Sequence, residues 1–176
     1  MISEILDKGG DPNLTDKQGW SALYWVAGRD HHEQQSKAVI VLLITNGADP
    51  NFQNASGLSS LHQSARAGRS VITSILLGLG AFMNLQDHAG CTALYLSAWH
   101  KRIACVRVLL KAGASSSIRE YKNGWNPLIA ATYGGHVEVM EVLLNEGKDL
   151  IINTQDFTGK TSLYWAAQKG HKKGTI

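Results

Sequence analysis

The sequence predicts an all-α solenoid, a stack of helix-turn-helix units joined by hairpin-like loops. Three observations lead to this fold class. A glycine recurs at spacings of 38, 33, 34 and 35 residues, and a leucine and then an alanine follow each copy. An aliphatic run with helical spacing comes next, and another glycine closes it. A period near 33 residues indicates an array of small units. The recurring glycines are Gly19, Gly57, Gly90, Gly124 and Gly159.

The stretch 87–114, DHAGCTALYLSAWHKRIACVRVLLKAGA, is the most regular unit. Thr92 is placed to cap a first helix by accepting a backbone N–H bond. Leu94 and Ala98 are four residues apart, so they share one face of that helix. The run around Val106 has the three-and-four spacing of a second helix, and Gly113 suits a left-handed C-cap. No such unit buries its apolar face alone, so neighbouring units must stack.

These residues resemble the ankyrin repeat, whose pattern runs D-x-x-G-x-T-P-L-H-x-A-A, then G-H, then L-L-x-x-G-A-D-x-N. The segments SAL, SSL, TAL, NPL and TSL follow the five glycines, and Gly-Ala closes three of the second helices. The resemblance covers nearly the whole chain and implies an ankyrin-repeat solenoid. It divides a single domain, 1–176, into a partial repeat 1–15, repeats at about 16–53, 54–86, 87–120 and 121–155, and a truncated repeat 156–176.

The chain departs from the family pattern at several places. The first unit carries about five extra residues in 28–37, GRDHHEQQSK, where we expect a solvated loop between two helices. In the fourth unit KDLIIN replaces the compact loop, and we expect Ile151 and Ile152 to pack between units. The chain begins and ends within a unit, which favours a piece of a longer array or ends that something else covers.

Composition narrows the class of function. Hydrophobic residues make up 44% of the chain and charged residues 18%, as in a packed globular protein. A net charge of +3 is too small to indicate nucleic acid or an anionic membrane as partner, and no apolar run is long enough to insert into a bilayer. We expect Cys105 in the core, Cys91 exposed and no disulfide between them. A reducing compartment, the cytoplasm or alternatively the nucleus, fits this cysteine usage.

No set of residues indicates an enzyme, a metal site or a cofactor. The adjacent His31 and His32, with Asp30 and Glu33, allow a weak metal site, but a solvated loop explains them better. The segment 78–83, GLGAFM, imitates a dinucleotide-binding fingerprint but closes a helix instead of opening one. We interpret His62 as structural, and the basic tail at 169–173 as a frayed end.

The resemblance implies that partners dock on the concave face, formed by the loop tips and the exposed side of the first helices. Aromatic residues are frequent at these positions, and Trp, Tyr and Arg are common in binding hot spots. The alternative is that some of these rings pack sideways between adjacent loops, namely Trp20, Trp125, Trp99 or Tyr133. Trp25 and Trp165 are expected to pack beside the core, and Tyr24, Tyr95 and Tyr164 to be structural. The candidate partner-binding residues are Trp20, Leu58, Arg66, His88, Cys91, Trp99, His100, Trp125, Tyr133, Phe157 and Lys160.

The function expected from the resemblance is that of a protein–protein interaction module, a scaffold or an adaptor, present as a monomer or as part of a longer array. The alternative is a regulatory or targeting segment of a ubiquitin-ligase receptor, a kinase or a channel, whose chemistry lies elsewhere. The resemblance also implies that the loop residues Asn51 and Asn84 are candidates for hydroxylation by an intracellular oxygenase.

Overall fold

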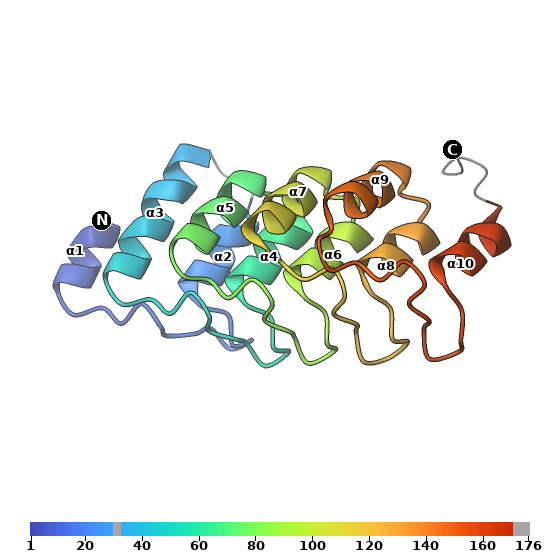
Figure 1. Cartoon of the computed structure of the whole chain (residues 1–176). Coiled ribbons are helices and arrows are strands. Elements are labelled where there is room, and N and C mark those ends of the chain that lie inside the picture. Colours follow the sequence, from blue (N-terminus) through green and yellow to red (C-terminus); the bar gives the residue numbers. More distant parts are fainter. Residues whose placement is uncertain (30–32, 171–176) are drawn as a thin grey trace.

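The computed structural model describes residues 1–29 and 33–170, and within them it is helical. The helices form two layers with the loops along one edge (Figure 1). Helices α2, α4, α6, α8 and α10 pack in sequence as a layer of first helices, and α3, α5, α7 and α9 as a layer of second helices. The predicted all-α solenoid is confirmed. The bounds are α1 Ile2–Asp7, α2 Ala22–Gly28, α3 Glu33–Thr45, α4 Ser60–Ala67, α5 Ser70–Gly78, α6 Ala93–Trp99, α7 Ile103–Ala112, α8 Pro127–Tyr133, α9 Val137–Glu146 and α10 Ser162–Lys169.

The first helices begin at short polar side chains. Ser21, Thr92, Asn126 and Thr161 each accept a hydrogen bond from the backbone N–H three residues on. Such a bond satisfies one of the four backbone donors that a helix N-terminus leaves free. The predicted cap at Thr92 is confirmed, and so is the left-handed C-cap at Gly113, where φ is 96°.

The recurring leucine of each unit lies in the core between the layers. Leu23, Leu61, Leu94 and Leu128 are at most 2% exposed, and the alanine that follows each is fully buried. Alanine at this position lets the adjacent helix approach closely because it has no side chain beyond Cβ. In α10 the equivalent Leu163 is 71% exposed, since no further described helix packs over it.

Two expectations about the irregular segments are wrong. Residues 33–37, predicted as part of a solvated loop, form the first turns of α3, which has 13 residues against 9 in α5. The aliphatic residues Ile151 and Ile152 do not pack between units, because both are about 60% exposed. Leu150 packs against the core in their place.

The loop tips are joined from unit to unit by backbone hydrogen bonds. The amides of His88, Tyr121 and Phe157 donate to carbonyl oxygens of the preceding tip at 2.8–3.1 Å. The tip glycines make this approach possible. Gly124 has φ 74°, a left-handed conformation that favours glycine, and a Cβ there would lie 2.7 Å from the Phe157 ring. The loops therefore form a continuous ladder beside the helices.

The loop at 115–117 lacks the D-x-N pattern, and serine side chains make the contacts to the next unit there. Ser115, Ser116 and Ser117, which stand in place of D-x-N, all donate hydroxyl hydrogen bonds to the carboxylate of Asp149 in the next unit. Partial burial works against ionisation of Asp149, but these bonds outweigh it and hold its pKa well below the usual range. One carboxylate therefore ties two adjacent loops together.

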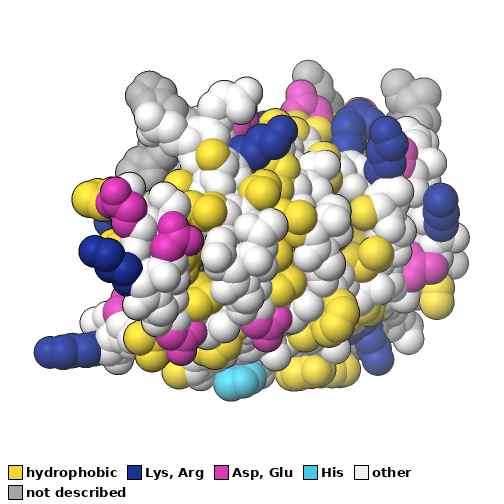
Figure 2. Space-filling model, turned by 90° about the vertical axis from the view of Figure 1, so that its left-hand side faces the viewer, with side chains coloured by type: hydrophobic (Ala, Val, Ile, Leu, Met, Phe, Trp, Pro, Cys, Tyr) yellow, Lys and Arg dark blue, Asp and Glu magenta, His cyan; other side chains and the backbone are white. Residues whose placement is uncertain are grey.

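Both ends of the described stack expose apolar side chains. At the N-terminal end Ile5 is 59% and Leu14 70% exposed, and Figure 2, which views that end, shows hydrophobic side chains spread among polar ones. At the other end Leu163 and Tyr164 are exposed. None of the described helices has both the length and the hydropathy needed to cross a bilayer.

Candidate functional site

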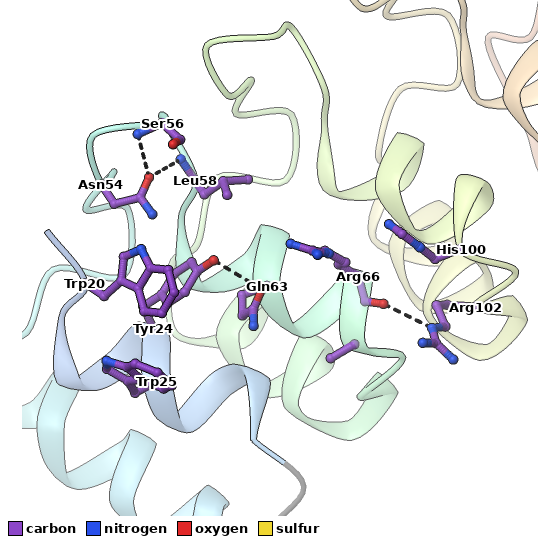
Figure 3. A pocket seen from close by; sticks show the side chains of 11 residues that line it. Trp20, Tyr24, Trp25, Asn54, Ser56, Leu58, Gln63, Arg66, His100 and Arg102 are labelled. Atoms are coloured by element: carbon purple, nitrogen blue, oxygen red, sulfur yellow. Dashed lines mark hydrogen bonds between the residues drawn. The ribbon is translucent and has the colours of Figure 1, made fainter. Parts of the chain in front are cut away.

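A groove of about 660 Å³ crosses the outer side of the first helices α2, α4 and α6, which we call the first-helix face. Figure 3 shows that its walls come from three successive units, with aromatic side chains at one end and basic ones at the other. Four of the predicted partner-binding residues line it. These are Trp20, Leu58, Arg66 and His100.

The aromatic end is built by the first unit. The Trp20 ring lies 5.5 Å from Tyr24 and 4.8 Å from Trp25, between ring centroids. The Trp25 indole donates to Asp16 at 3.0 Å, and the same carboxylate accepts the backbone N–H of Trp20. The rings are therefore held in place by contacts within the chain, and Trp25 remains 37% exposed.

The middle of the groove is polar. The Tyr24 hydroxyl donates to Gln63 Oε1 at 3.2 Å, which fixes the amide of Gln63 on the groove floor. Asn54 Oδ1 accepts the backbone N–H groups of Ser56 and Leu58, so its side chain shapes the loop that forms one wall (Figure 3). The two amide side chains place hydrogen-bonding groups beside the apolar surface of Leu58.

The basic end is built by Arg66 at the end of α4, His100 at the end of α6, and Arg102 before α7. Arg102 Nε donates to the carbonyl oxygen of Arg66 at 3.0 Å. The Arg102 side chain lies across Gly68, where a Cβ would come within 2.8 Å of its Cδ. Partial burial lowers the pKa of His100, and the neighbouring charges of Arg66, Arg102 and His136 lower it further. The local potential is therefore positive.

A second aromatic group, the α6–α10 cluster, extends along the same face. It consists of Tyr95, Trp99, Trp125, Tyr133 and Trp165, with ring centroids 4.7–6.4 Å apart in successive pairs. The indoles of Trp125 and Trp165 both donate to Asp156 Oδ2, at 3.2 and 2.9 Å. The cluster thus joins three units through ring packing and one shared carboxylate.

Asp156 is buried beneath this cluster. Its burial opposes ionisation, but hydrogen bonds from the Lys160 amide, the Thr158 hydroxyl and the Trp165 indole outweigh that effect and lower its pKa to about 2. Lys160 also places its ammonium 4.5 Å from the Trp165 ring centroid, and Lys169 places one 4.0 Å from Tyr133. The chain's own cations therefore cover part of the cluster.

The structure corrects the expected exposure of two candidate residues. Trp125 is only 8% exposed, because Tyr133 and Trp165 pack against it, so the sideways-packing alternative holds for this residue. Cys91 is half-buried instead of exposed. Burial, together with the carboxylates of Asp87 and Glu120, raises the pKa of Cys91 to about 12. Its thiol therefore stays protonated near neutral pH.

The remaining candidates lie along the loop tips and the first helices. Trp99 is 38% exposed and stacks on Tyr133 at an interplanar angle of 13°. His88 and Phe157 are exposed at the tips, and each packs over the glycine of the preceding tip. Both therefore support the loop ladder as well as presenting surface. The predicted packing position of Trp165 is confirmed, whereas Trp25 and Tyr164 are more exposed than expected.

Sequence reasoning missed several polar side chains of the groove, among them Gln63 and Arg102. Gln63 occupies the unit position that holds Trp25 and Trp165 elsewhere, so aligning the units marks it as a surface position. Arg102 lies in the turn between α6 and α7, a region that the repeat pattern leaves variable, and no sequence signal indicated that it reaches Arg66.

The buried polar residues have structural partners. His62 is 1% exposed; its Nδ1 lies 3.1 Å from the Ser59 amide and its Nε2 3.0 Å from the Cys91 carbonyl oxygen, which confirms its structural interpretation. Both cysteines are free, and Cys105 is in the core as predicted. Segment 78–83 closes α5, as expected for a repeat and not for a nucleotide site.

Within 1–29 and 33–170, no three His, Cys, Asp or Glu side chains gather closely enough to hold a metal ion. The weak metal site at Asp30, His31 and His32 lies outside the described residues, as does most of the basic tail. The hydroxylation of Asn51 and Asn84 stays a prediction. Asn51 bridges to the next unit, where it accepts the Phe82 amide and donates to the Gly80 carbonyl.

Comparison with known proteins agrees with this architecture. The family model for ankyrin repeats (3 copies) matches residues 33–120 and 115–175. The human protein named "SH3 and multiple ankyrin repeat domains protein 2" is 34% identical over 167 residues, which cover 94% of this chain and 9% of that protein. An ankyrin repeat protein of Rickettsia felis is 32% identical over 72 residues, 41% of this chain and 32% of that protein. The chain thus spans a small part of the length of these relatives.

Proposed function

The chain belongs to the ankyrin-repeat family, and from this we propose that it is a protein-interaction module that docks another protein on its first-helix face. Ankyrin repeats are protein-interaction modules, and a stack of this kind offers a continuous surface that no single unit has. The observation that carries the proposal is the groove across α2, α4 and α6. It combines exposed rings, an aliphatic wall and arginines, the side chains that dominate protein interfaces.

The role we propose is that of a scaffold or adaptor inside the cell, without catalysis of its own. The described groove supplies hydrogen-bonding and apolar groups but no nucleophile paired with a base. A cytoplasmic or nuclear location is part of the same proposal, and it is consistent with the two free cysteines.

A second proposal is that the chain is the targeting or regulatory segment of a longer protein. The human relative supports it, because its name combines SH3 with multiple ankyrin repeat domains and this chain matches 9% of its length. Binding through the first-helix face would then direct chemistry that other domains carry out. The full-length reading frame tests this proposal directly.

The experiment that tests the interaction role is affinity capture with three matched baits: the wild-type chain, Arg66→Glu and Lys111→Glu. Both variants change one exposed cation to an anion, but Lys111 lies on α7 in the layer of second helices. We expect a partner held by the wild type and by Lys111→Glu and lost by Arg66→Glu. A partner held equally by all three baits would place the docking surface elsewhere.

A further inference from the structure

The basic end of the groove has charges that the described part of the protein does not neutralise. Across 1–29 and 33–170, no carboxylate lies within 4.0 Å of the guanidinium of Arg66 or Arg102. Arg102 uses one of its five N–H donors on the Arg66 carbonyl, and the Arg102 residue is exposed. His100 lines the same end of the groove as both arginines, whose charges lower its pKa in addition to the effect of its partial burial.

The guanidinium group of Arg102 is also pre-oriented. The contact with Gly68 and the bond to the Arg66 carbonyl hold the Arg102 side chain along the end of α4. Arg66 lies between this position and Gln63 (Figure 3). A planar, pre-oriented guanidinium binds carboxylate in a two-bond fork and loses less entropy than a lysine would. The arrangement suits a carboxylate better than a diffuse negative surface.

The opposite end of the groove offers a different kind of contact. Trp20 and the side chain of Leu58 present apolar surface, and Gln63 lies between them and the arginines. The Asp16 carboxylate at this end already accepts the Trp25 indole and the amides of Gln18 and Trp20. An occupant must therefore be apolar at one end, carry hydrogen-bonding groups in the middle, and be acidic at the other.

We infer that the groove binds an extended acidic segment of a partner protein. An apolar side chain of this segment packs against Trp20 and Leu58, its main chain meets Gln63, and its Asp or Glu carboxylates bind Arg66 and Arg102. The inference rests on the proposed function and specifies the partner's chemistry. Charge complementarity across the groove carries it, because no carboxylate of the described chain pairs with the guanidinium groups at the basic end.

The test is a display selection in which random 12-residue peptides, capped at both ends, are selected on the wild-type chain. The selected peptides are then titrated against three variants of matched folding, checked by circular dichroism. Arg66→Gln with Arg102→Gln removes the two groove charges. Lys37→Gln with Lys111→Gln removes two exposed charges from the layer of second helices. Leu58→Ser removes the apolar wall and keeps the charges.

We expect the selected peptides to be enriched in Asp and Glu and to contain an apolar residue a few positions away. Their Kd should rise at least tenfold in the Arg66/Arg102 variant and less than twofold in the Lys37/Lys111 variant, and binding should weaken as salt is added. Replacing the acidic residues by Asn or Gln should remove the difference between the two double variants.

Three outcomes would overturn the inference. Neutral or basic peptides that lose binding with Leu58→Ser but not with the arginine variant would refute the acidic partner and leave the proposed function standing. Binding that requires phosphoserine in place of Asp and Glu, or a single-stranded oligonucleotide that outcompetes the peptides, would show that another anion is preferred. Peptides insensitive to every groove variant would refute both the inference and the proposed docking face.

Discussion

The carboxylate of Asp156 is predicted to hold the α6–α10 cluster together, and its replacement by asparagine tests this. Oδ1 of Asp156 accepts the amides of Thr158 and Lys160, and Oδ2 accepts the two indoles of Trp125 and Trp165. Asparagine preserves the first oxygen but places an NH₂ group where two indole donors point. The variant therefore leaves both N–H groups without an acceptor inside a buried cluster.

The size of the effect follows from the pKa. A fall from 3.8 to about 2 corresponds to roughly 2 kcal/mol of stability, since one pKa unit is worth about 1.4 kcal/mol. The folded pKa is depressed, so this contribution is fully present above pH ~4 and is lost as the pH falls through about 2. An unsatisfied buried donor costs about 1–3 kcal/mol, which agrees in scale. We expect Asp156→Asn to lower the free energy of unfolding by about 2–4 kcal/mol.

Asp87 and Asp16 are matched controls. Asp87 accepts the amides of Ala89 and Cys91 in the same way, but the residue nine positions later is Leu96 instead of a tryptophan. Asp16 receives one indole and is exposed. The loss of stability should therefore decrease in the order Asp156→Asn, Asp16→Asn, Asp87→Asn.

The assay is urea unfolding followed by tryptophan fluorescence, with hydrogen exchange of segment 121–170 because repeat proteins can unfold locally. The free energy of unfolding of the wild type should fall between pH 4 and pH 2, and in Asp156→Asn this fall should be smaller. Equal losses for Asp156→Asn and Asp87→Asn, or an unchanged acid limb, would refute the role assigned to the shared carboxylate.

Three further predictions concern the ladder and the core. Gly124→Ala should lower the free energy of unfolding in urea by at least about 1 kcal/mol more than Gly159→Ala does. Both glycines have positive φ, but only at Gly124 would the new Cβ press against a neighbouring ring. Equal losses would contradict the close approach of the loop tips. Burial lowers the pKa of His62, so its contribution to stability should be present above pH ~6.5 and decline as the pH falls below it, and His62→Gln should reduce that decline in urea midpoints measured from pH 7 to pH 5. Asp149→Ala should increase hydrogen exchange at Ser116 and its neighbours; unchanged exchange would show that the three hydroxyl bonds do not order the loop.

The repeat period predicted the fold because every unit carries the same pattern and so gives the same evidence. Leu94 and Ala98 occupy the same core position as their counterparts in other units, so each copy supports the same interpretation. The inserted residues of the first unit had no such counterpart. Whether they form a loop or lengthen α3 depends on their contacts in the folded stack, and the sequence pattern alone favoured the wrong alternative for residues 33–37.

The exposure of individual surface residues was harder to predict, because it depends on neighbouring units. Trp20 and Trp125 hold the same position in their repeats, yet one lines the groove and the other is buried. The difference arises one unit later. Trp165 of the following unit packs against Trp125, whereas the equivalent position in the unit after Trp20 holds Gln63.

The same comparison explains why the groove lies where it does. Along the first-helix face, the third and fourth units fill one position with the rings of Trp99 and Tyr133, which stack on each other. The second unit holds Arg66 at that position, and a guanidinium on a flexible stem does not close the space that a packed ring would fill. The second unit thus has a cation where the third and fourth units have a ring, and an amide where the first and fifth units have Trp25 and Trp165. The physical consequence is a groove with rings at one end and guanidinium groups without a carboxylate partner in the described chain at the other, and this is why we propose the docking surface there.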